Sequence, residues 1–200
     1  MEEAISSLKE GMCAVYPTST QPALGCLPNS RSLDLLYSLK KRRRDQPVSL
    51  GVANLEQAGQ IAHIPEGVKE MIQYFPRGSI TIVLDSKETL DNRLGGDRVA
   101  VRLVSHKVAV RLIEEVGPLT ATSANISGKS PLGNPSLAAK SLSTEDTKVP
   151  FVNGICGRGA PSTLISWHSS TGSPDATVTK VLREGLVDEM EVFDWLKNRI

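Results

Sequence analysis

The sequence predicts a single domain of the α/β or mixed α+β class, in which helices cover a sheet. Segments with strand patterns alternate with segments of helical periodicity along the whole chain, which is typical of this class. A length of 200 residues, 40% of them hydrophobic, suits one domain with a substantial core. We find neither an internal repeat nor a linker, so residues 1–200 are expected to form one unit.

The expected helices follow from apolar periodicity and from residues that begin or end helices. Ile5 and Leu8 share one face of the first helix, and a basic run ends the second. The residues expected to begin helices are Asn29 or Ser30, Asn54 and Pro65, and the glycines expected to end them are Gly11 and Gly117. The helices are expected over residues 2–10, 31–44, 55–62, 66–74, 107–117 and 188–199.

The expected strands are short apolar or alternating runs. In the clearest one, Val99, Val101 and Leu103 alternate with Ala100 and Arg102. Arg102 is therefore expected to face away from the core, onto a groove or into solvent. The strands are expected over residues 12–18, 47–54, 79–85, 97–104, 118–123, 149–154, 162–167 and 177–184, and the loops over 127–136 and 153–162.

Composition excludes several classes of protein. A net charge of +1 gives no general attraction to nucleic acid or membrane, and 4% aromatic residues argue against a stacking platform for single strands. Cys13, Cys26 and Cys156 lack the paired spacing of a zinc site and are interpreted as reduced thiols of a cytoplasmic protein. The N-terminal segment has no apolar signal region, and no run approaches the roughly 20 apolar residues of a membrane span.

Several familiar catalytic patterns are also missing. The segment TATSANISGKSP ends in Gly128-Lys129-Ser130 like a phosphate-binding P-loop, but Ser123 stands where the first glycine of a P-loop belongs. There is no Gly-x-Ser-x-Gly elbow, and three scattered histidines give no metal-ligand spacing. Nothing in the spacing pairs Cys156 with a histidine as a nucleophile.

Cations and hydroxyl groups point instead to an anion site. Residues 40–44 form the densest basic run, which is either a solvated helix end or an anion clamp to which only some of the five contribute. Arg102 lies inside a strand and Arg183 near the end of another. The hydroxyl-rich segments YPTST, TATSANIS and PST stand at strand ends, where sheets of this class bind ligands. The residues alone thus predict a polar, cationic groove for a polyphosphate or a carboxylate.

Five motifs, in this order, resemble those of the YrdC-like family of threonylcarbamoyl-AMP synthases. AVYPTSTQPALGC is similar to the family's Y-P-T-[DE]-T-x-Y-G-L-G, and LKKRRRDQPVSLGV to its K-x-R-x4-P-[LI]. VAVRLVSHKVAVRLIEEVGPLTATSANISGKSP is the nearest match, with V-[AG]-V-R and T-S-A-N-[IL]-S-G-x-x-P. PSTLISW and VLREG complete the set. The similarity runs over about residues 3–187.

The resemblance implies a single domain with a twisted mixed sheet and a large concave basic cavity. It also implies a reaction: L-threonine and bicarbonate (or CO2) give N-carboxy-threonine, which attacks the α-phosphate of ATP to form threonylcarbamoyl-AMP and pyrophosphate. Mg²⁺ is expected alongside ATP. The product would serve N6-threonylcarbamoyladenosine formation in tRNA, with downstream threonylcarbamoyl-transfer proteins as partners and tRNA or double-stranded RNA as further candidates.

The same match implies roles for nine side chains, which position substrates and neutralise charge rather than act as acids or bases. The expected ATP-binding residues are Lys40, Arg42, Ser123, Asn125 and Arg183. The expected threonine-binding residues are Thr18, Arg102, Thr122 and Ser162. No metal ligand of the protein is implied. Four other basic residues, three in the run 40–44 and one in TATSANISGKSP, are expected at the surface: Lys41, Arg43, Arg44 and Lys129.

The chain departs from the family pattern in the first motif. Ser19 stands where the family has an acidic residue, and Pro22-Ala23, after Gln21, replaces its Tyr-Gly. These changes favour an alternative of another class, a YrdC-like RNA-binding paralogue without adenylate chemistry. The retained cations and the Ser-x-Asn pair favour the enzyme. Carbamoyl chemistry, as in the related domain of hydrogenase maturation factors, is a third option that the short chain disfavours.

Overall fold

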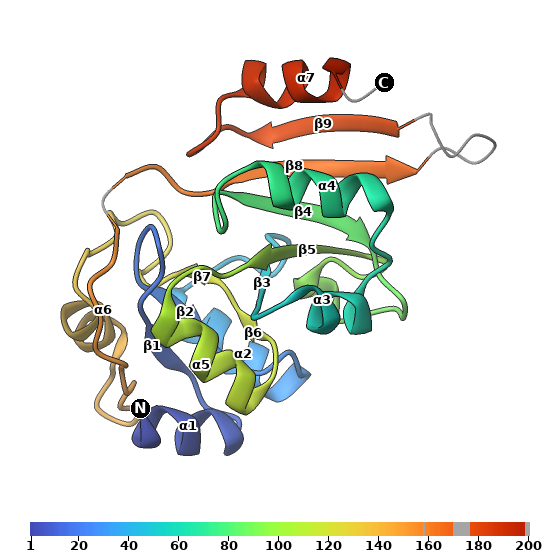
Figure 1. The fold of residues 1–200 in the computed structure, drawn as a ribbon. Coiled ribbons are helices and arrows are strands. Elements are labelled where there is room, and N and C mark those ends of the chain that lie inside the picture. The colour runs from blue at the N-terminus through green and yellow to red at the C-terminus, as the bar shows by residue number, and fades with distance from the viewer. Residues whose placement is uncertain (158, 170–176, 199–200) are drawn as a thin grey trace.

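Two sheets of unequal size organise the fold in the computed structural model, which describes residues 1–157, 159–169 and 177–198 (Figure 1). The larger sheet contains, in spatial order, β6 (Leu119–Thr120), β3 (Leu50–Val52), β5 (Arg98–Leu103), β4 (Ile80–Asp85), β8 (Thr163–Ser169) and β9 (Thr177–Arg183). The smaller contains β1 (Ala14–Tyr16), β2 (Ala23–Gly25) and β7 (Thr122–Ser123). The pairs β3–β5 and β4–β8 are parallel and the others antiparallel, so the expected mixed sheet is confirmed.

Helices cover these sheets from several sides (Figure 1). They are α1 (Glu2–Lys9), α2 (Ser30–Lys40), α3 (Leu55–Ile61), α4 (Glu66–Tyr74), α5 (Lys107–Val116), α6 (Pro135–Leu142) and α7 (Glu189–Asn198), with a 3₁₀ turn η1 at Asn92–Leu94. In Figure 1, α7 lies along the outer edge strand β9, whereas α1, α2 and α5 lie at the opposite end near β1. Within the described ranges, no helix is long and apolar enough to span a membrane.

Apolar side chains fill two adjoining clusters. The larger joins Leu33 and Leu36 of α2 to Ile82 of β4 and Ile165 of β8, all of them buried. The smaller packs α1 and α5 against Tyr16 and its neighbours. Each large side chain buried in this way contributes about 1.5–3 kcal/mol of transfer free energy. The alternation predicted for residues 99–103 is confirmed, because Val99 and Val101 are buried in the core while Arg102 faces a cavity.

Helix α2 ends earlier than the sequence suggests. Asn29 caps its first turn by accepting a hydrogen bond from the Ser32 amide at 3.0 Å. The helix was expected to continue through residue 44, but it stops at Lys40 because Lys41 takes a left-handed conformation, with φ of 48°. The basic residues that follow therefore leave the helix axis and point in different directions.

The strand expected over residues 118–123 is divided between the two sheets. Thr120 on β6 pairs with Leu50 in the larger sheet, whereas Thr122 on β7 pairs with Leu24 in the smaller one. Ala121 lies between them, and its amide donates a hydrogen bond of 2.8 Å to the Ser49 carbonyl. The chain thus crosses from one sheet to the other within one residue.

Other differences concern short or context-dependent elements. The prediction of a strand over 149–154 is wrong, because the segment forms only an isolated bridge between Phe151 and Val15. Strand β2, turn η1 and helix α6 were not expected; Asn134, which caps α6, and Pro135 at its first turn were available signals. Residue 199, the last of the expected closing helix, lies outside the described residues.

Arg93 joins α2 to the turn that precedes β5. Its guanidinium donates to Asp91 at 2.6 Å, to Asp34 at 2.7 Å and to the hydroxyl of Ser30 at 3.0 Å, and its side chain is 7% exposed. The Tyr37 ring lies 5.8 Å below it. These bonds satisfy a buried cation at a point where two distant segments meet.

We expect Arg93→Ala to lower the free energy of unfolding by roughly 2–3 kcal/mol, less than for fully buried ion pairs because Asp34 is half exposed. Urea denaturation at neutral pH measures this. Arg43→Ala is the matched control, since Arg43 and its partner Asp45 are both largely exposed, and it should leave the midpoint unchanged. Equal midpoints for wild type and Arg93→Ala would contradict the role of Arg93.

The same contacts predict an acid dependence. The hydrogen bond from Arg93 lowers the pKa of Asp91 to about 2. Because the carboxylate of an unfolded chain titrates near 4, Asp91 stabilises the fold above about pH 4 and loses that contribution as the pH falls through about 2. Urea titrations between pH 5 and pH 2 should show a shallower decline for Arg93→Ala than for wild type.

Candidate functional site

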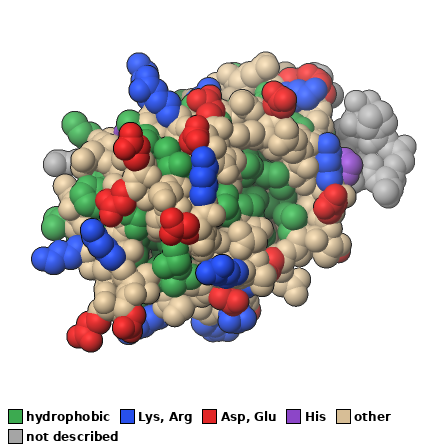
Figure 2. Space-filling view, turned by 90° about the horizontal axis from the view of Figure 1, so that it is seen from below, with side chains coloured by type: hydrophobic (Ala, Val, Ile, Leu, Met, Phe, Trp, Pro, Cys, Tyr) green, Lys and Arg blue, Asp and Glu red, His purple; other side chains and the backbone are tan. Residues whose placement is uncertain are grey.

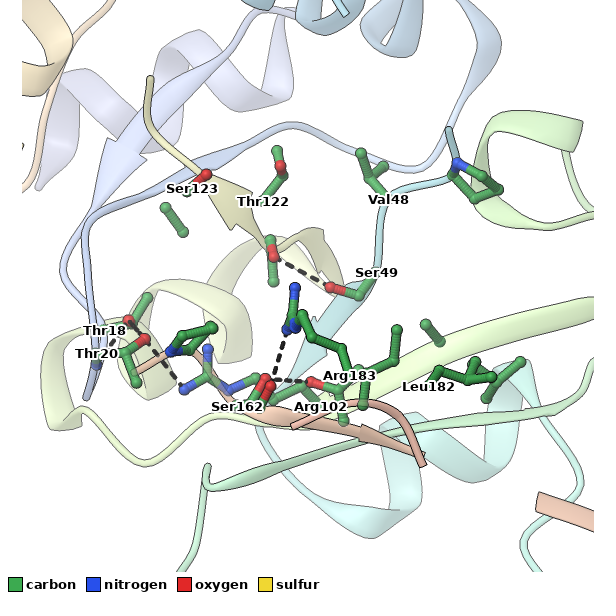
Figure 3. Close-up of a pocket in the computed structure, with 18 of the residues that line it drawn as sticks. Thr18, Thr20, Val48, Ser49, Arg102, Thr122, Ser123, Ser162, Leu182 and Arg183 are labelled. Carbon is green, nitrogen blue, oxygen red and sulfur yellow. Dashed lines mark hydrogen bonds between the residues drawn. The ribbon is translucent and has the colours of Figure 1, made fainter. Parts of the chain in front are cut away.

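A cavity of about 650 Å³ lies where the two sheets meet, a size usual for small-molecule sites. Seven of the nine side chains expected from the sequence line it: Thr18, Arg42, Arg102, Thr122, Ser123, Ser162 and Arg183. They come from segments up to 165 residues apart in sequence, namely the loop after β1, the turn after α2, and strands β5, β7 and β9 with the segment before β8. The fold therefore gathers most of the expected site in one place (Figure 3).

Hydroxyl groups and a buried guanidinium form one end of the cavity. The hydroxyls of Thr18 and Thr20 lie 3.1 Å apart, and that of Thr18 donates to the carbonyl of Gln21 at 2.6 Å. Arg102 donates through Nε to the Gly78 carbonyl at 2.9 Å and through an Nη to the Ser19 hydroxyl at 3.1 Å. In Figure 3 the Arg102 side chain extends towards Thr18 and Thr20.

Arg102 is a buried cation whose hydrogen-bond partners are neutral. It is 8% exposed, and burial lowers its pKa below the ordinary value, with an opposing effect from Tyr16 and a further lowering by the charge of Arg183. Carbonyl and hydroxyl oxygens accept hydrogen bonds from Arg102 but leave its charge uncompensated. A carboxylate or phosphate that entered this end would supply the missing negative charge.

A second wall joins β4, β8 and β9. The hydroxyls of Ser162 and Thr81 are 2.7 Å apart, and Arg183 donates to the Ser162 carbonyl at 2.8 Å. Figure 3 shows the Arg183 side chain reaching from β9 towards Ser49 and Thr122 on the far wall. Arg183 thus crosses the cavity between the hydroxyl end and the opposite wall.

Arg42, Thr122 and Ser123 form that opposite wall. The Arg42 guanidinium donates to the carbonyls of Gln46 and Pro47 at 2.9 and 3.0 Å, which fixes it at the cavity edge. Ser123 is exposed to the cavity at the end of β7. The turn at Lys41 is what brings Arg42 to this position.

The two remaining expected residues lie behind the wall rather than in it. Lys40 is 1% exposed, and its ammonium donates to the carbonyls of Ser123 and of Asn125, the latter at 2.8 Å. The Asn125 amide donates to the carbonyls of Ile126 and Lys129 at 2.9 and 2.6 Å. Neither Lys40 nor Asn125 lines the cavity, so the ATP-binding roles expected for them stay predictions.

Some cavity residues were missed by sequence reasoning. They are Thr20, Gln21, Ser49, Thr81 and Arg98. Arg98 carried a usable signal, since residues 98, 100 and 102 of one strand share a face and all line the cavity. Its guanidinium also donates to the Trp167 carbonyl and contacts the His168 ring, so it reaches across β4 to link β5 with β8.

The segment before β8 reaches the cavity through close backbone contacts. A Cβ added at Gly157 would lie 1.9 Å from the Ser19 carbonyl oxygen, and one at Gly154 would lie 2.5 Å from the Pro17 ring. Only glycine permits such an approach to the loop after β1. This contact brings Ser162 to the same cavity as Thr18.

The substituted first motif lies in the cavity wall. Gln21, Pro22 and Ala23 all line it, and Ser19 accepts the hydrogen bond from Arg102 described above. A serine at position 19 leaves the Arg102 charge unpaired, which an acidic residue there would neutralise. The change thus makes this end of the cavity more positive.

Thiol or metal chemistry would need an activated cysteine or a cluster of metal-binding side chains. Burial raises the pKa of Cys156, against a smaller effect of the Thr18 backbone, so its thiol is not activated as a nucleophile. In the ranges that the structure describes, no group of three or more His, Cys, Asp or Glu side chains could hold a metal ion. Among the described residues, no carboxylate lines the cavity. Four arginines do: Arg42, Arg98, Arg102 and Arg183.

Comparison with known proteins agrees with this arrangement. A putative threonylcarbamoyl-AMP synthase of Mycobacterium tuberculosis is 30% identical over 197 residues, which cover 96% of this chain and 87% of the relative. The threonylcarbamoyl-AMP synthase of Bacillus subtilis is 31% identical over 172 residues, which cover 82% of this chain and 49% of the relative. The chain thus spans about half the length of the Bacillus protein.

Solved structures give the same result. The crystal structure of Pyrococcus abyssi Sua5 complexed with L-threonine superposes with a TM-score of 0.82 at 28% identity, and covers 96% of this chain but only 56% of the Pyrococcus chain. Escherichia coli YciO, at 21% identity and a TM-score of 0.74, supports the fold alone. The family model for Sua5, YciO and YrdC, described as telomere recombination, matches residues 6–185. The chain therefore belongs to the Sua5/YciO/YrdC family.

Proposed function

We propose that this chain is an ATP-dependent L-threonylcarbamoyladenylate synthase, which makes threonylcarbamoyl-AMP and pyrophosphate from L-threonine, bicarbonate or CO2, and ATP. The cavity itself is the observation that carries the proposal. In it, a hydroxyl-lined pocket around Arg102 adjoins the side chains of Arg42, Arg183 and Ser123. Relatives named threonylcarbamoyl-AMP synthase cover most of the chain. The Pyrococcus protein of the same fold was crystallised with L-threonine.

The reaction joins two substrates whose charges repel each other. The neutral threonine amine first adds to CO2, which is supplied directly or by loss of hydroxide from bicarbonate. The nitrogen then gives up a proton to water, which leaves a carbamate. A carbamate oxygen then attacks the α-phosphorus of ATP while the bond from that phosphorus to the bridging oxygen of pyrophosphate breaks. Both reactants are anions, so the protein has to hold them together and offset the negative charge that gathers between them.

The lining side chains suit these two tasks. We assign Thr18, Arg102, Thr122 and Ser162 to threonine, with the guanidinium of Arg102 facing its carboxylate. We assign Arg42 and Ser123 of the opposite wall to the phosphates, together with Arg183, which extends towards that wall. Guanidinium and hydroxyl groups can donate the hydrogen bonds that the carboxylate and the phosphates need. No side chain is required to move a proton.

Mg²⁺ is proposed to enter with ATP. The donor set of the cavity fits this, since its described lining provides serine and threonine hydroxyls but no carboxylate that would hold a resident ion. Such a cation is commonly bound by substrate phosphates and water. When bound, Mg²⁺ would offset part of the phosphate charge, while the arginines hold the remaining oxygens.

The product and its setting belong to the same proposal. Threonylcarbamoyl-AMP would pass to downstream threonylcarbamoyl-transfer proteins that modify tRNA, and a cytoplasmic location agrees with the three free cysteines. The RNA-binding alternative is not favoured, because the curated relatives are named synthases. Figure 2 shows acidic and basic side chains intermingled on one face of the molecule, with no single-sign patch there for an RNA backbone.

Pyrophosphate release tests the activity. With MgATP, bicarbonate and L-threonine the protein should release pyrophosphate, and omission of either threonine or bicarbonate should reduce release to background. Arg102→Met should raise the KM for threonine roughly 10- to 100-fold, because it removes a charge-assisted partner of the carboxylate. Pyrophosphate release that does not depend on threonine and bicarbonate would exclude the proposed reaction.

A pair of arginines tests the phosphate wall. Arg42→Ala should weaken ATP binding about 10- to 100-fold, as expected for the loss of a charged hydrogen bond. Arg44→Ala is the matched control, since Arg44 is two residues away and pairs with Asp34 at the surface. Isothermal titration of both variants with MgATP gives the comparison. If Arg44→Ala proved the more damaging, the assignment of Arg42 would be wrong.

A further inference from the structure

Lys40 is a buried lysine whose identified partners are carbonyl oxygens rather than carboxylates. Its side chain is 1% exposed, and its ammonium donates to the backbone of Ser123 and of Asn125, more than 80 residues away in sequence. Burial, and to a lesser degree the charge of Arg42, lowers the pKa of Lys40 to about 8. The group is therefore still mainly protonated at neutral pH.

The backbone of Lys40 strengthens the same link. Its carbonyl accepts a hydrogen bond of 2.8 Å from the amide of Ser127. The end of α2 is thus joined to residues 123–127 by three hydrogen bonds, two through the side chain and one through the main chain. Removal of the ammonium would leave the carbonyls of Ser123 and Asn125 without these donors.

The left-handed turn at Lys41 separates Lys40 from Arg42. Lys40 lies on the last turn of α2 beneath the loop, whereas Arg42 emerges at the cavity edge and lines the wall. Two cations that are neighbours in the Lys-x-Arg motif therefore occupy different layers. Of these two residues, Arg42 alone lines the cavity, where a phosphate would meet its guanidinium.

We propose that Lys40 is a positioning residue, which holds the Ser123–Asn125 backbone so that the Ser123 hydroxyl faces the ATP phosphates, and that it does not itself contact ATP. This inference rests on the proposed ATP site. It assigns the phosphate contact of the motif to Arg42 alone. It also explains why an ammonium is buried here, since its two carbonyl acceptors are supplied by the loop that it fixes.

A double-mutant cycle distinguishes positioning from contact. Lys40→Met keeps the apolar stem and removes the donor, so it should weaken ATP binding roughly tenfold by releasing the loop that carries Ser123. Lys40→Met combined with Ser123→Ala should bind ATP no more weakly than Lys40→Met alone. When Lys40→Met is combined with Arg42→Ala, the fold-losses of ATP affinity in the two single variants should multiply. Lys129→Ala, an exposed cation on the same loop, should bind like wild type.

Two results would overturn the proposal. One is that the losses of ATP affinity multiply when Lys40→Met is combined with Ser123→Ala. The other is that Lys40→Met alone binds ATP as tightly as wild type. Wild-type protein that fails to bind MgATP would instead overturn the proposed function, so the two failures are distinguishable. Circular dichroism shows whether Lys40→Met has folded before it is titrated.

Unmodified protein gives a second measurement should Lys40→Met not fold. Acylation by a bulky lysine-reactive ester, followed by mass spectrometry, compares Lys40 with Lys129 without and with MgATP. Burial beneath the loop predicts that Lys40 reacts at least about tenfold more slowly than Lys129 in both conditions, despite its lowered pKa. A Lys40 that reacts readily and is protected only by MgATP would show direct contact and refute the proposal.

Discussion

The crossing of the chain between its two sheets is the constraint on which the site depends. Thr120 completes the larger sheet and Thr122 the smaller one, so Ala121 fixes the distance between them. Tyr16 reinforces the crossing, since its buried hydroxyl donates to the Thr120 carbonyl at 2.9 Å. The cavity exists because the two sheets meet at this point without merging. Ser123 lies at its wall because β7 ends there.

Uncompensated positive charge is the second feature of the cavity. Elsewhere in the molecule arginines meet carboxylates, as Arg93 meets Asp34 and Asp91. At the cavity, Arg102 and Arg183 donate hydrogen bonds to carbonyl and hydroxyl oxygens, which do not offset their charge. Partial enclosure strengthens this field relative to water. A polyphosphate and an amino-acid carboxylate are ligands that would complete it.

Sequence alone predicts the parts that local patterns determine. The alternation around Arg102 and the glycine after α5 are such patterns, and the family motifs name seven residues that the fold brings to the cavity. The division of residues 119–123 depends on tertiary partners, so periodicity does not reveal it. The left-handed turn at Lys41 is closed by local hydrogen bonds to the carbonyls of Ser38 and Tyr37, but a lysine gives no signal for a conformation that favours glycine. The burial of Lys40 is likewise hidden, because lysine is normally exposed and its two acceptors come from a distant loop.

In the proposed reaction, this cavity joins a threonine carbamate to the α-phosphate of ATP. Mass spectrometry of the reaction with ¹³C-bicarbonate, L-threonine and MgATP tests it most directly. We predict a threonylcarbamoyl-AMP product that carries one ¹³C atom and disappears when threonine is omitted. Formation of AMP and pyrophosphate without a labelled adenylate, or of no adenylate at all, would contradict the claim.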